Sequence, residues 1–374
     1  MHTDILDLPT PALLLDLSRL ERNAARMKEK VHQLGVTLRP HVKTSKSIAV
    51  LRVLAGGEDV PITVSTLAEA RYFFAHGVTD ILYAVGIAPV KLPEVADLIR
   101  AGCKLRVILD TVEAAAAVRA FVETNDVGIE ALIEIDSDGH RAGVAPDDPL
   151  LIDIGRTLGD RLAGVMTHAG ASYDCRTREE FEAMAEQERS LTVQAAERLR
   201  VAGFGCSIVS VGSTPTLHYA RGLEGVTEVR AGVYAFGDLV QAELGTCAMD
   251  DIAIGVLASV IGHNRHHGRV LIDAGFLALS RDRGTADMPL DWGYGAVCDP
   301  AGNLIESVTV SSTNQEHGII TSRCGEIDFE RFPVGRRVKV LPNHACATAA
   351  AYDRYFVTNG SERIVDVWDR VNGW

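Results

Sequence analysis

Short runs of β-branched and other apolar residues alternate with longer stretches rich in Ala, Leu and Glu over about the first 240 residues. The runs predict strands at 12–16, 37–42, 62–65, 81–84, 105–110, 131–136, 164–168, 208–212 and 228–230. The stretches between them predict helices at 17–34, 67–76, 90–101, 111–124 and 148–158. Another helix begins at Thr177, where Thr177 and Glu180 have capping-box spacing, and ends near Gly203. This alternation predicts a parallel sheet, and about eight such units fit a (β/α)8 TIM barrel.

The pattern changes near Thr246, where segments of alternating polarity are separated by Gly and Asn turns. These segments predict strands at 252–260, 269–273, 304–310 and 337–341. We therefore expect a barrel over residues 13–245, followed by an antiparallel β domain over 246–374 that also includes residues 1–12. No linker rich in Pro, Gly and Ser separates the two parts, so we expect them to pack tightly.

Composition excludes several classes of function. The chain has 374 residues, of which 47% are hydrophobic and 23% charged, and no apolar run approaches the roughly 20 residues that span a bilayer. The net charge of −13 argues against nucleic acid as a partner, because phosphate backbones require clustered positive charge. The first seven residues lack the basic start of a secretory or transit signal, so we expect a cytoplasmic protein without a membrane partner.

The seven cysteines are scattered and lack CxxC spacing, so neither a disulfide framework nor a structural zinc module is indicated. One of them, Cys346, stands two positions after His344. In extended backbone such a pair points the same way and can bind one metal ion. Two protein ligands leave positions for water or substrate, which is typical of a catalytic metal rather than a structural one.

Polar residues directly follow several predicted barrel strands, at the ends where the βα loops build the active face of such barrels. They are Lys43, Arg141, His168, Ser213 and Thr214. A single lysine at such a position is usually a solvated surface charge, but here the other polar groups are expected on the same rim. Small residues at 212–214 and 231–233 can present backbone N–H groups to a phosphate. The signatures of a P-loop and of a Rossmann dinucleotide site are missing.

An ordered set of motifs extends over nearly the whole chain. They are Thr-Pro-Ala-Leu-Leu-Leu-Asp at 10–16, Arg-Pro-His-Val-Lys-Thr at 39–44, Arg-Ala-Gly-Val at 141–144, Arg-Ala-Gly-Val-Tyr-Ala-Phe at 230–236, Asp-Ala-Gly-Phe at 273–276, Gln-Glu-His-Gly at 315–318 and Pro-Asn-His-Ala-Cys at 342–346. Together they resemble the D-serine dehydratase and D-threonine aldolase family. The set is highly specific as a whole, although no single motif decides the matter.

The resemblance implies an alanine-racemase-type fold: a barrel that binds pyridoxal 5′-phosphate (PLP), a following β domain, and a head-to-tail homodimer. It implies that Lys43 binds the cofactor covalently and that Arg141 holds its phenolic oxygen. His168 would lie beside the pyridine ring, with Tyr173 nearby. The remaining implied roles are a phosphate cradle from Thr214, Gly232 and Val233, and metal ligation by His344 and Cys346.

The implied reaction is the dehydration of a small 3-hydroxy D-amino acid to a keto acid and ammonia. Lys43 would remove the α-proton, and a divalent metal would help the β-hydroxyl to leave. A thiolate ligand favours zinc, with manganese as the alternative. Aldolases of the family typically carry Asp at the position of Cys346, so Cys346 favours a dehydratase. Ser45 replaces a histidine common in the D-serine enzymes, which brings D-threonine and D-threo-3-hydroxyaspartate into consideration beside D-serine.

Three other functions remain open at this level. A retro-aldol lyase would give glycine and an aldehyde from a D-threonine-like substrate. A non-catalytic PLP carrier would share the barrel but lack the β domain, and a racemase would need a tyrosine base that no family-like motif supplies. The histidines at 263, 266 and 267 predict a polar hairpin turn, and Arg281, Asp282, Arg283 and Asp291 predict a solvated loop. His317 belongs to a family-like motif without a predicted role.

Overall fold

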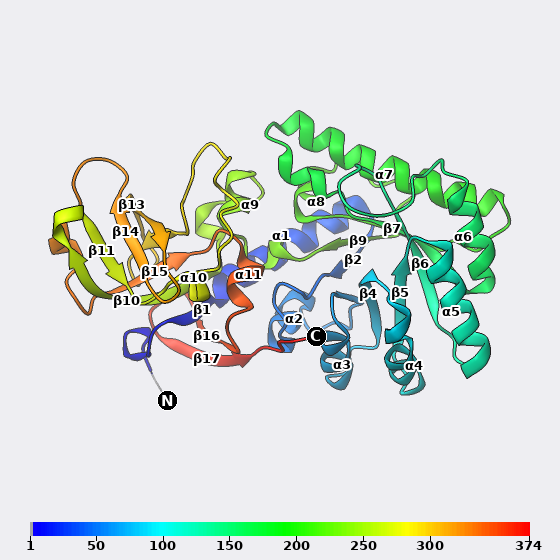
Figure 1. The fold of residues 1–374 in the computed structure, drawn as a ribbon, viewed down its shortest axis with the longest axis horizontal. Coiled ribbons are helices and arrows are strands. Elements are labelled where there is room, and N and C mark those ends of the chain that lie inside the picture. The colour runs from blue at the N-terminus through cyan, green and yellow to red at the C-terminus, as the bar shows by residue number, and fades with distance from the viewer. Residues whose placement is uncertain (1–2) are drawn as a thin grey trace. The chain divides into compact units, whose positions relative to one another are not determined.

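The computed structural model describes residues 3–374 and divides the chain into two compact units. One, here called the barrel unit, comprises residues 26–232 and 371–374. The other, the β unit, comprises the residues up to 25 together with 233–370. Figure 1 shows the order of the elements along the chain. None of the helices within residues 3–374 is long and apolar enough to cross a membrane.

The barrel unit contains a parallel sheet of eight strands in the order β2-β9-β8-β7-β6-β5-β4-β3. Its strands are β2 (Thr37–Pro40), β3 (Ile62–Val64), β4 (Asp80–Gly86), β5 (Lys104–Leu109), β6 (Glu130–Ile135), β7 (Leu162–Thr167), β8 (Ile208–Val211) and β9 (Glu228–Ala231). A parallel bridge between His41 and Thr63 joins the two outer strands, β2 and β3, and closes the sheet. The predicted (β/α)8 barrel is confirmed.

Helix α1 precedes the first barrel strand, and a helix follows each strand from β2 to β8 in the expected alternation (Figure 1). They are α1 (Leu17–Leu34), α2 (Ile48–Ala55), α3 (Leu67–Ala75), α4 (Leu92–Arg100), α5 (Val112–Asn125), α6 (Leu150–Leu158), α7 (Arg178–Val201) and α8 (Thr214–Tyr219). The capping box predicted at Thr177 and Glu180 begins α7, because each side chain accepts a hydrogen bond from the other residue's backbone N–H. The first nine residues of α1 belong to the β unit and the rest to the barrel unit.

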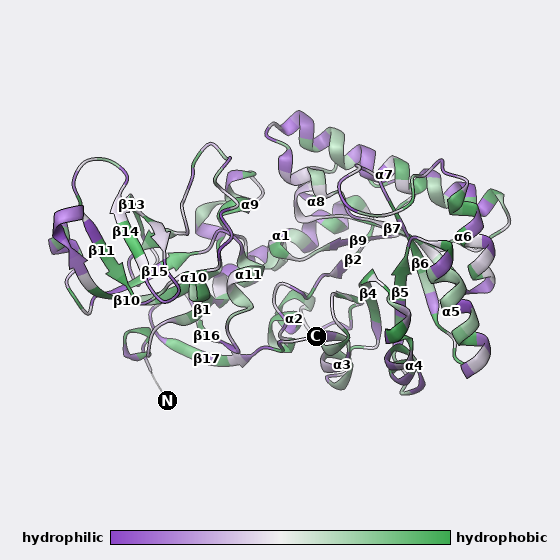
Figure 2. Ribbon diagram, viewed as in Figure 1, coloured by the Kyte–Doolittle hydropathy of each residue, from purple (hydrophilic) through white to green (hydrophobic). Residues whose placement is uncertain are grey.

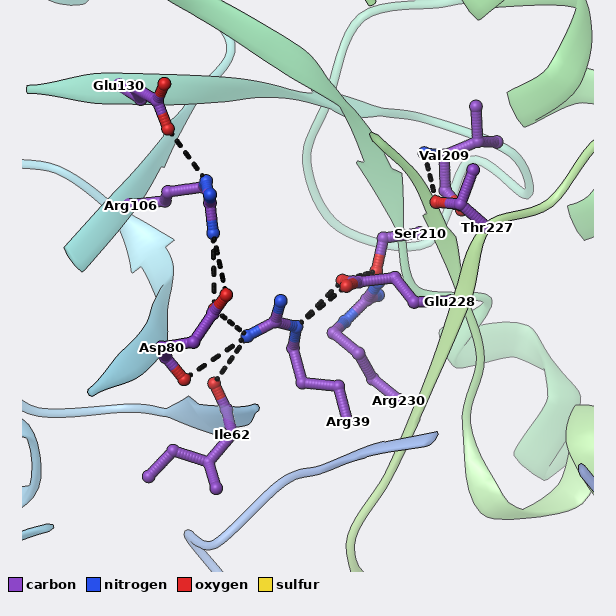
Figure 3. Close-up of polar contacts among 10 residues, drawn as sticks. All are labelled: Arg39, Ile62, Asp80, Arg106, Glu130, Val209, Ser210, Thr227, Glu228 and Arg230. Carbon is purple, nitrogen blue, oxygen red and sulfur yellow. Dashed lines mark hydrogen bonds and ion pairs between the residues drawn. The ribbon is translucent and has the colours of Figure 1, made fainter. Parts of the chain in front are cut away.

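Charged residues form a network at the end of the barrel where the strands begin (Figure 3). The Arg39 guanidinium lies 2.9 Å from a Glu228 carboxylate oxygen and 2.7 Å from Asp80 Oδ1. Arg106 continues the network from Asp80 to Glu130, at 3.2 and 2.9 Å. Burial alone would raise the pKa of Asp80, but the charges of Arg39 and Arg106 outweigh that effect and lower it. The opposing charges compensate one another at this end of the barrel. The candidate site residues lie at the other end, after the C-terminal ends of the strands.

The β unit contains a sheet of nine strands in the order β11-β14-β13-β12-β15-β10-β1-β16-β17. Its elements are β1 (Ala12–Asp16), β10 (Ile254–Asn264), β11 (Arg269–Ile272), β12 (Ala296–Cys298), β13 (Leu304–Thr313), β14 (Gly318–Ser322), β15 (Arg337–Leu341), β16 (Arg354–Thr358) and β17 (Ile364–Asp369), with the short helices α9 (Leu239–Glu243), α10 (Phe276–Leu279) and α11 (Ala345–Ala349). The predicted hairpin turn at 263–267 joins β10 and β11. All strand pairs are antiparallel except β1 with β16.

The two compact units meet in the chain at 25/26, 232/233 and 370/371, whereas the sequence predicted domain boundaries at 12/13 and 245/246. Strand β1 pairs with β10 and β16, so the segment up to residue 25 belongs to the β unit. Residues 233–245 belong there too, because Leu239 packs in an apolar core with Ile252 and Trp292. Figure 2 shows β10 as largely hydrophobic, in agreement with the burial of its first seven residues, whereas α7 alternates between hydrophilic and hydrophobic positions.

Candidate active site and metal centre

Lys43 lies in the turn that directly follows β2, with its side chain exposed. A backbone hydrogen bond of 2.7 Å from Lys46 N to Val42 O closes this turn, and Lys46 has a positive φ of 49°. The Lys46 ammonium is held 2.9 Å from Oε1 of the fully buried Glu69, and Lys46 O accepts a hydrogen bond from Val371 N at 2.8 Å. The backbone that presents Lys43 is therefore fixed from several sides.

Two histidines, His41 and His168, lie close enough to Lys43 for its charge to act on them. Burial, followed by the charges of Lys43, Arg141 and Arg230, lowers the pKa of His168 to about 3. Burial and the charge of Lys43 lower the pKa of His41 in the same direction. Both imidazoles are therefore neutral near pH 7. The Nδ1 atom of His41 is buried and has no hydrogen-bond partner within residues 3–374.

Gly232 directly follows β9 and lies against the lysine turn. A Cβ atom at this position would lie 2.8 Å from His41 O and 2.9 Å from Thr44 Oγ1. A side chain would therefore displace the backbone on either side of Lys43, so the position requires glycine. Val233 comes next and opens the short 3-10 helix η5 (Val233–Ala235).

The loop after β8 leads into α8. Gly212 has a φ of 121°, and Ser213 caps the helix through a reciprocal pair of hydrogen bonds with Thr216. Thr214, the first helical residue, is buried. The arrangement places backbone N–H groups and hydroxyls at one strand end, which suits a phosphate group.

The carboxylate of Glu188, on α7, fixes this loop and its neighbour. Its Oε1 accepts hydrogen bonds from Ala169 N at 3.0 Å, next to His168, and from Gly212 N at 3.1 Å. Glu188 is only 2% exposed. The sequence did not indicate a role for Glu188, because a glutamate on a long polar helix is expected to be exposed to solvent.

Arg141 and Tyr173 complete the predicted cofactor residues. Arg141 lies in the loop after β6, is exposed, and places Nη2 3.3 Å from Glu134 Oε1. Tyr173 lies half-buried in the 3-10 helix η4 (Gly170–Asp174), which follows β7. Both residues therefore follow strand ends on the side of the barrel where Lys43 lies.

The predicted metal pair lies at the start of α11 rather than in a strand. His344 is the extended N-cap residue, but Cys346 is the second residue of the helix, so the expectation of extended backbone through both residues was wrong. The two side chains nevertheless interact through a hydrogen bond. His344 Nδ1 also lies 2.6 Å from Asp282 Oδ2.

Two carboxylates that sequence reasoning did not select support this pair. Burial alone would lower the pKa of His344, but hydrogen bonds to Asp282 and Cys346 and the nearby charges raise it to about 11. Asp238 is buried and accepts hydrogen bonds from Ala345 N and Gln241 N, both at 2.9 Å. Burial raises the pKa of Asp238 to about 6. Within residues 3–374, no group of three or more His, Cys, Asp or Glu residues is placed to hold a metal ion.

The chain matches two family models, one for each part of its length. Residues 15–240 match the alanine racemase N-terminal domain, and residues 253–358 match the putative serine dehydratase domain. D-threo-3-hydroxyaspartate dehydratase of Delftia sp. strain HT23 is 51% identical over the full length of both chains. D-serine dehydratase of Dictyostelium discoideum is 31% identical over 100% of this chain and 99% of its own. The chain belongs to the D-serine dehydratase and D-threonine aldolase family.

Solved structures agree with membership of this family. The Delftia dehydratase superimposes with a TM-score of 0.97 at 50% identity, with full coverage of both chains. D-threonine aldolase of Filomicrobium marinum gives 0.83 at 26% identity and covers 99% of this chain and 97% of its own. Two further similar structures are of D-threo-3-hydroxyaspartate dehydratase: a histidine-to-alanine variant and a metal-free cysteine-to-alanine variant, in which the replaced residues are two positions apart. The named relatives are dehydratases and aldolases, so the family is one of lyases.

The residues of this chain fit the groups that the family implies. A lysine on a fixed turn, a neutral His168, the glycine contact at 232 and the loop before Thr214 suit PLP at the rim of the barrel unit. In the β unit, an imidazole and a thiol that already contact each other form a soft donor pair.

Proposed function

We propose that this protein is a PLP- and metal-dependent dehydratase of 3-hydroxy D-amino acids, with D-threo-3-hydroxyaspartate as its preferred substrate. The observation that carries the proposal is the 51% identity to the Delftia dehydratase over the whole of both chains. The structural neighbour with a metal-free cysteine variant supports a metal in this family. His344 and Cys346 have the same two-position spacing as the residues replaced in the two variants of D-threo-3-hydroxyaspartate dehydratase.

Each predicted residue has a task in this reaction. PLP, when bound, supplies an electron sink for the carbon that bears the amino group. Lys43 holds the cofactor and, once its Nζ is free, removes the α-proton from the substrate. His168 stays neutral beside it and adds no positive charge to the site. Thr214, Gly232 and Val233 hold the phosphate, while Arg141 and Tyr173 orient the cofactor ring.

His344 and Cys346 would hold a divalent ion, which supplies Lewis acidity toward a hydroxyl leaving group. The thiolate favours zinc over magnesium or calcium, and manganese is the alternative. The products are a keto acid and ammonia, because loss of water leaves an enamine that water hydrolyses. A head-to-tail homodimer and a cytoplasmic location remain predictions, and light scattering coupled to size-exclusion chromatography tests the first.

The experiment is a product assay on the purified full-length protein with PLP and zinc. D-threo-3-hydroxyaspartate, D-serine and D-threonine are supplied separately, and ammonia, keto acid, glycine and aldehyde are quantified. We expect keto acid and ammonia in equal amounts, fastest from D-threo-3-hydroxyaspartate. Glycine with an aldehyde would instead identify an aldolase, and absence of turnover with all three substrates would favour a cofactor carrier.

A further inference from the structure

The sequence predicts that the loop from 280 to 295, between α10 and β12, is solvated surface, but the loop contacts His344, one of the two proposed metal ligands. Asp282 Oδ2 lies 2.6 Å from His344 Nδ1, and the two side chains are 40% and 43% exposed. A contact between two half-exposed groups carries little weight by itself, because many surface ion pairs contribute nothing measurable.

Asn343, the residue directly before His344, shows that buried hydrogen bonds hold the loop in the position that allows this contact. Asn343 is buried and accepts a 2.8 Å hydrogen bond from Thr285, which lies on the same loop and is fully buried. Asn343 Nδ2 in turn donates to Gly293 O at 2.6 Å, and Trp292 N donates to Thr285 Oγ1 at 3.1 Å. The loop is therefore fastened to the residue directly before His344, which holds Asp282 in place.

The geometry has a direct chemical consequence for the imidazole. When a metal ion displaces the proton from Nε2, the imidazole of His344 keeps one N–H, and a carboxylate at Nδ1 holds that remaining proton on Nδ1. The Nε2 lone pair is then available to a metal ion, and the ring cannot rotate without losing a 2.6 Å hydrogen bond. A carboxylate in this position also makes the ligating nitrogen more basic.

We propose that Asp282 is a positioning residue that fixes the tautomer and ring orientation of His344 for metal binding. The inference rests on the proposed metal site. Asp282 acts through His344 rather than as a third ligand, because residues 3–374 contain no set of three donors placed around one ion. Asp238 has a different task, because it binds backbone N–H groups of Ala345 and Gln241 and so holds the helix start rather than the ring.

The test measures zinc affinity in the full-length protein carrying PLP, after removal of metal with a chelator. Zinc is titrated in competition with a chromophoric chelator of known affinity. Asp282→Asn keeps the size of the side chain but removes the anionic acceptor, and we expect zinc affinity to fall by about 10- to 100-fold. Asp287→Asn is the matched control: it makes the same charge change at an exposed position of the same loop, and we expect less than a twofold effect.

Asp282→Glu serves as the conservative rescue, and we expect it to recover part of the lost affinity. The unfolding temperature of each metal-free variant is measured in parallel, and it should match that of the unmodified protein. Equal zinc affinity in Asp282→Asn and the unmodified protein would overturn the inference while leaving the metal site intact. Failure of the unmodified protein to bind zinc would overturn the metal site itself, and a loss beyond about 1000-fold would make Asp282 a ligand.

Discussion

Removal of Glu188 should uncouple two loops of the proposed cofactor site from α7, the helix that supports them. Its Oε1 accepts hydrogen bonds from Ala169 N and Gly212 N, and its carboxyl group also bonds to Thr216. Glu188→Ala leaves two buried N–H groups without a partner, and each costs about 1–3 kcal/mol. Burial raises the pKa of Glu188, although its hydrogen bonds act in the opposite direction. The variant therefore also relieves a desolvation cost, and we expect a net loss of about 2–4 kcal/mol in the free energy of unfolding.

Two measurements check this expectation. Urea unfolding of the variant and of Glu188→Gln separates the lost acceptor from the lost charge, because the amide oxygen of Gln still accepts hydrogen bonds. We expect Glu188→Gln to lose less than about 1.5 kcal/mol. The dissociation constant of PLP, followed by cofactor absorbance, should rise in Glu188→Ala, because Gly212 precedes Thr214 in the proposed phosphate-binding loop. Unfolding within about 1 kcal/mol of the unmodified protein, with unchanged PLP affinity, would refute the reasoning.

Three further predictions concern the barrel rim. Lys43→Ala should abolish the absorbance of covalently bound PLP, whereas Lys46→Ala should retain it, and the reverse spectra would show that the wrong lysine was chosen. Gly232→Ala should weaken PLP binding, because its Cβ would lie 2.8 Å from His41 O; titration of the apoprotein with PLP measures this, and unchanged affinity would contradict it. His168 has a pKa of about 3 in the folded protein and about 6.5 when unfolded, so the unfolded chain binds more protons between these values. Stability should fall on acidification, by up to about 1.4 kcal/mol per pH unit. Urea unfolding from pH 6.5 to 4.5 should therefore show a shallower fall in His168→Gln, and equal slopes would exclude this role of His168.

Much of the barrel could be predicted from local pattern. α1 has its predicted bounds, and the barrel strands differ from theirs by a few residues at most, because apolar runs and caps are local signals. The partner of β1 could not be predicted in this way. Its apolar sequence suits a barrel strand equally well, but it pairs with β10 and β16, more than 200 residues away. Pairing over that distance depends on the whole fold.

The candidate site shows the same division. Residues that follow strand ends, such as Lys43 and His168, could be selected because a barrel places all such ends on one side. The helical position of Cys346 carried a local signal that was overlooked, since alanine-rich sequence at 345–349 favours a helix. Asp282 and Glu188 carried none, because a carboxylate on a loop or helix does not indicate which distant backbone or side chain it will meet.

The charged network at the base of the barrel has a consequence for protein engineering. Arg39 lies close to both Asp80 and Glu228, and the Arg39 and Glu228 side chains are buried, so replacement of Arg39 alone leaves the buried Glu228 carboxylate without its cationic partner. Tolerated sequences at these positions must therefore change in concert, and libraries that vary one site at a time should recover few active clones there. Attempts to alter substrate preference are better directed to the loops after β6, β7 and β8, where exchange of a side chain does not disturb the ion pairs of this charged network.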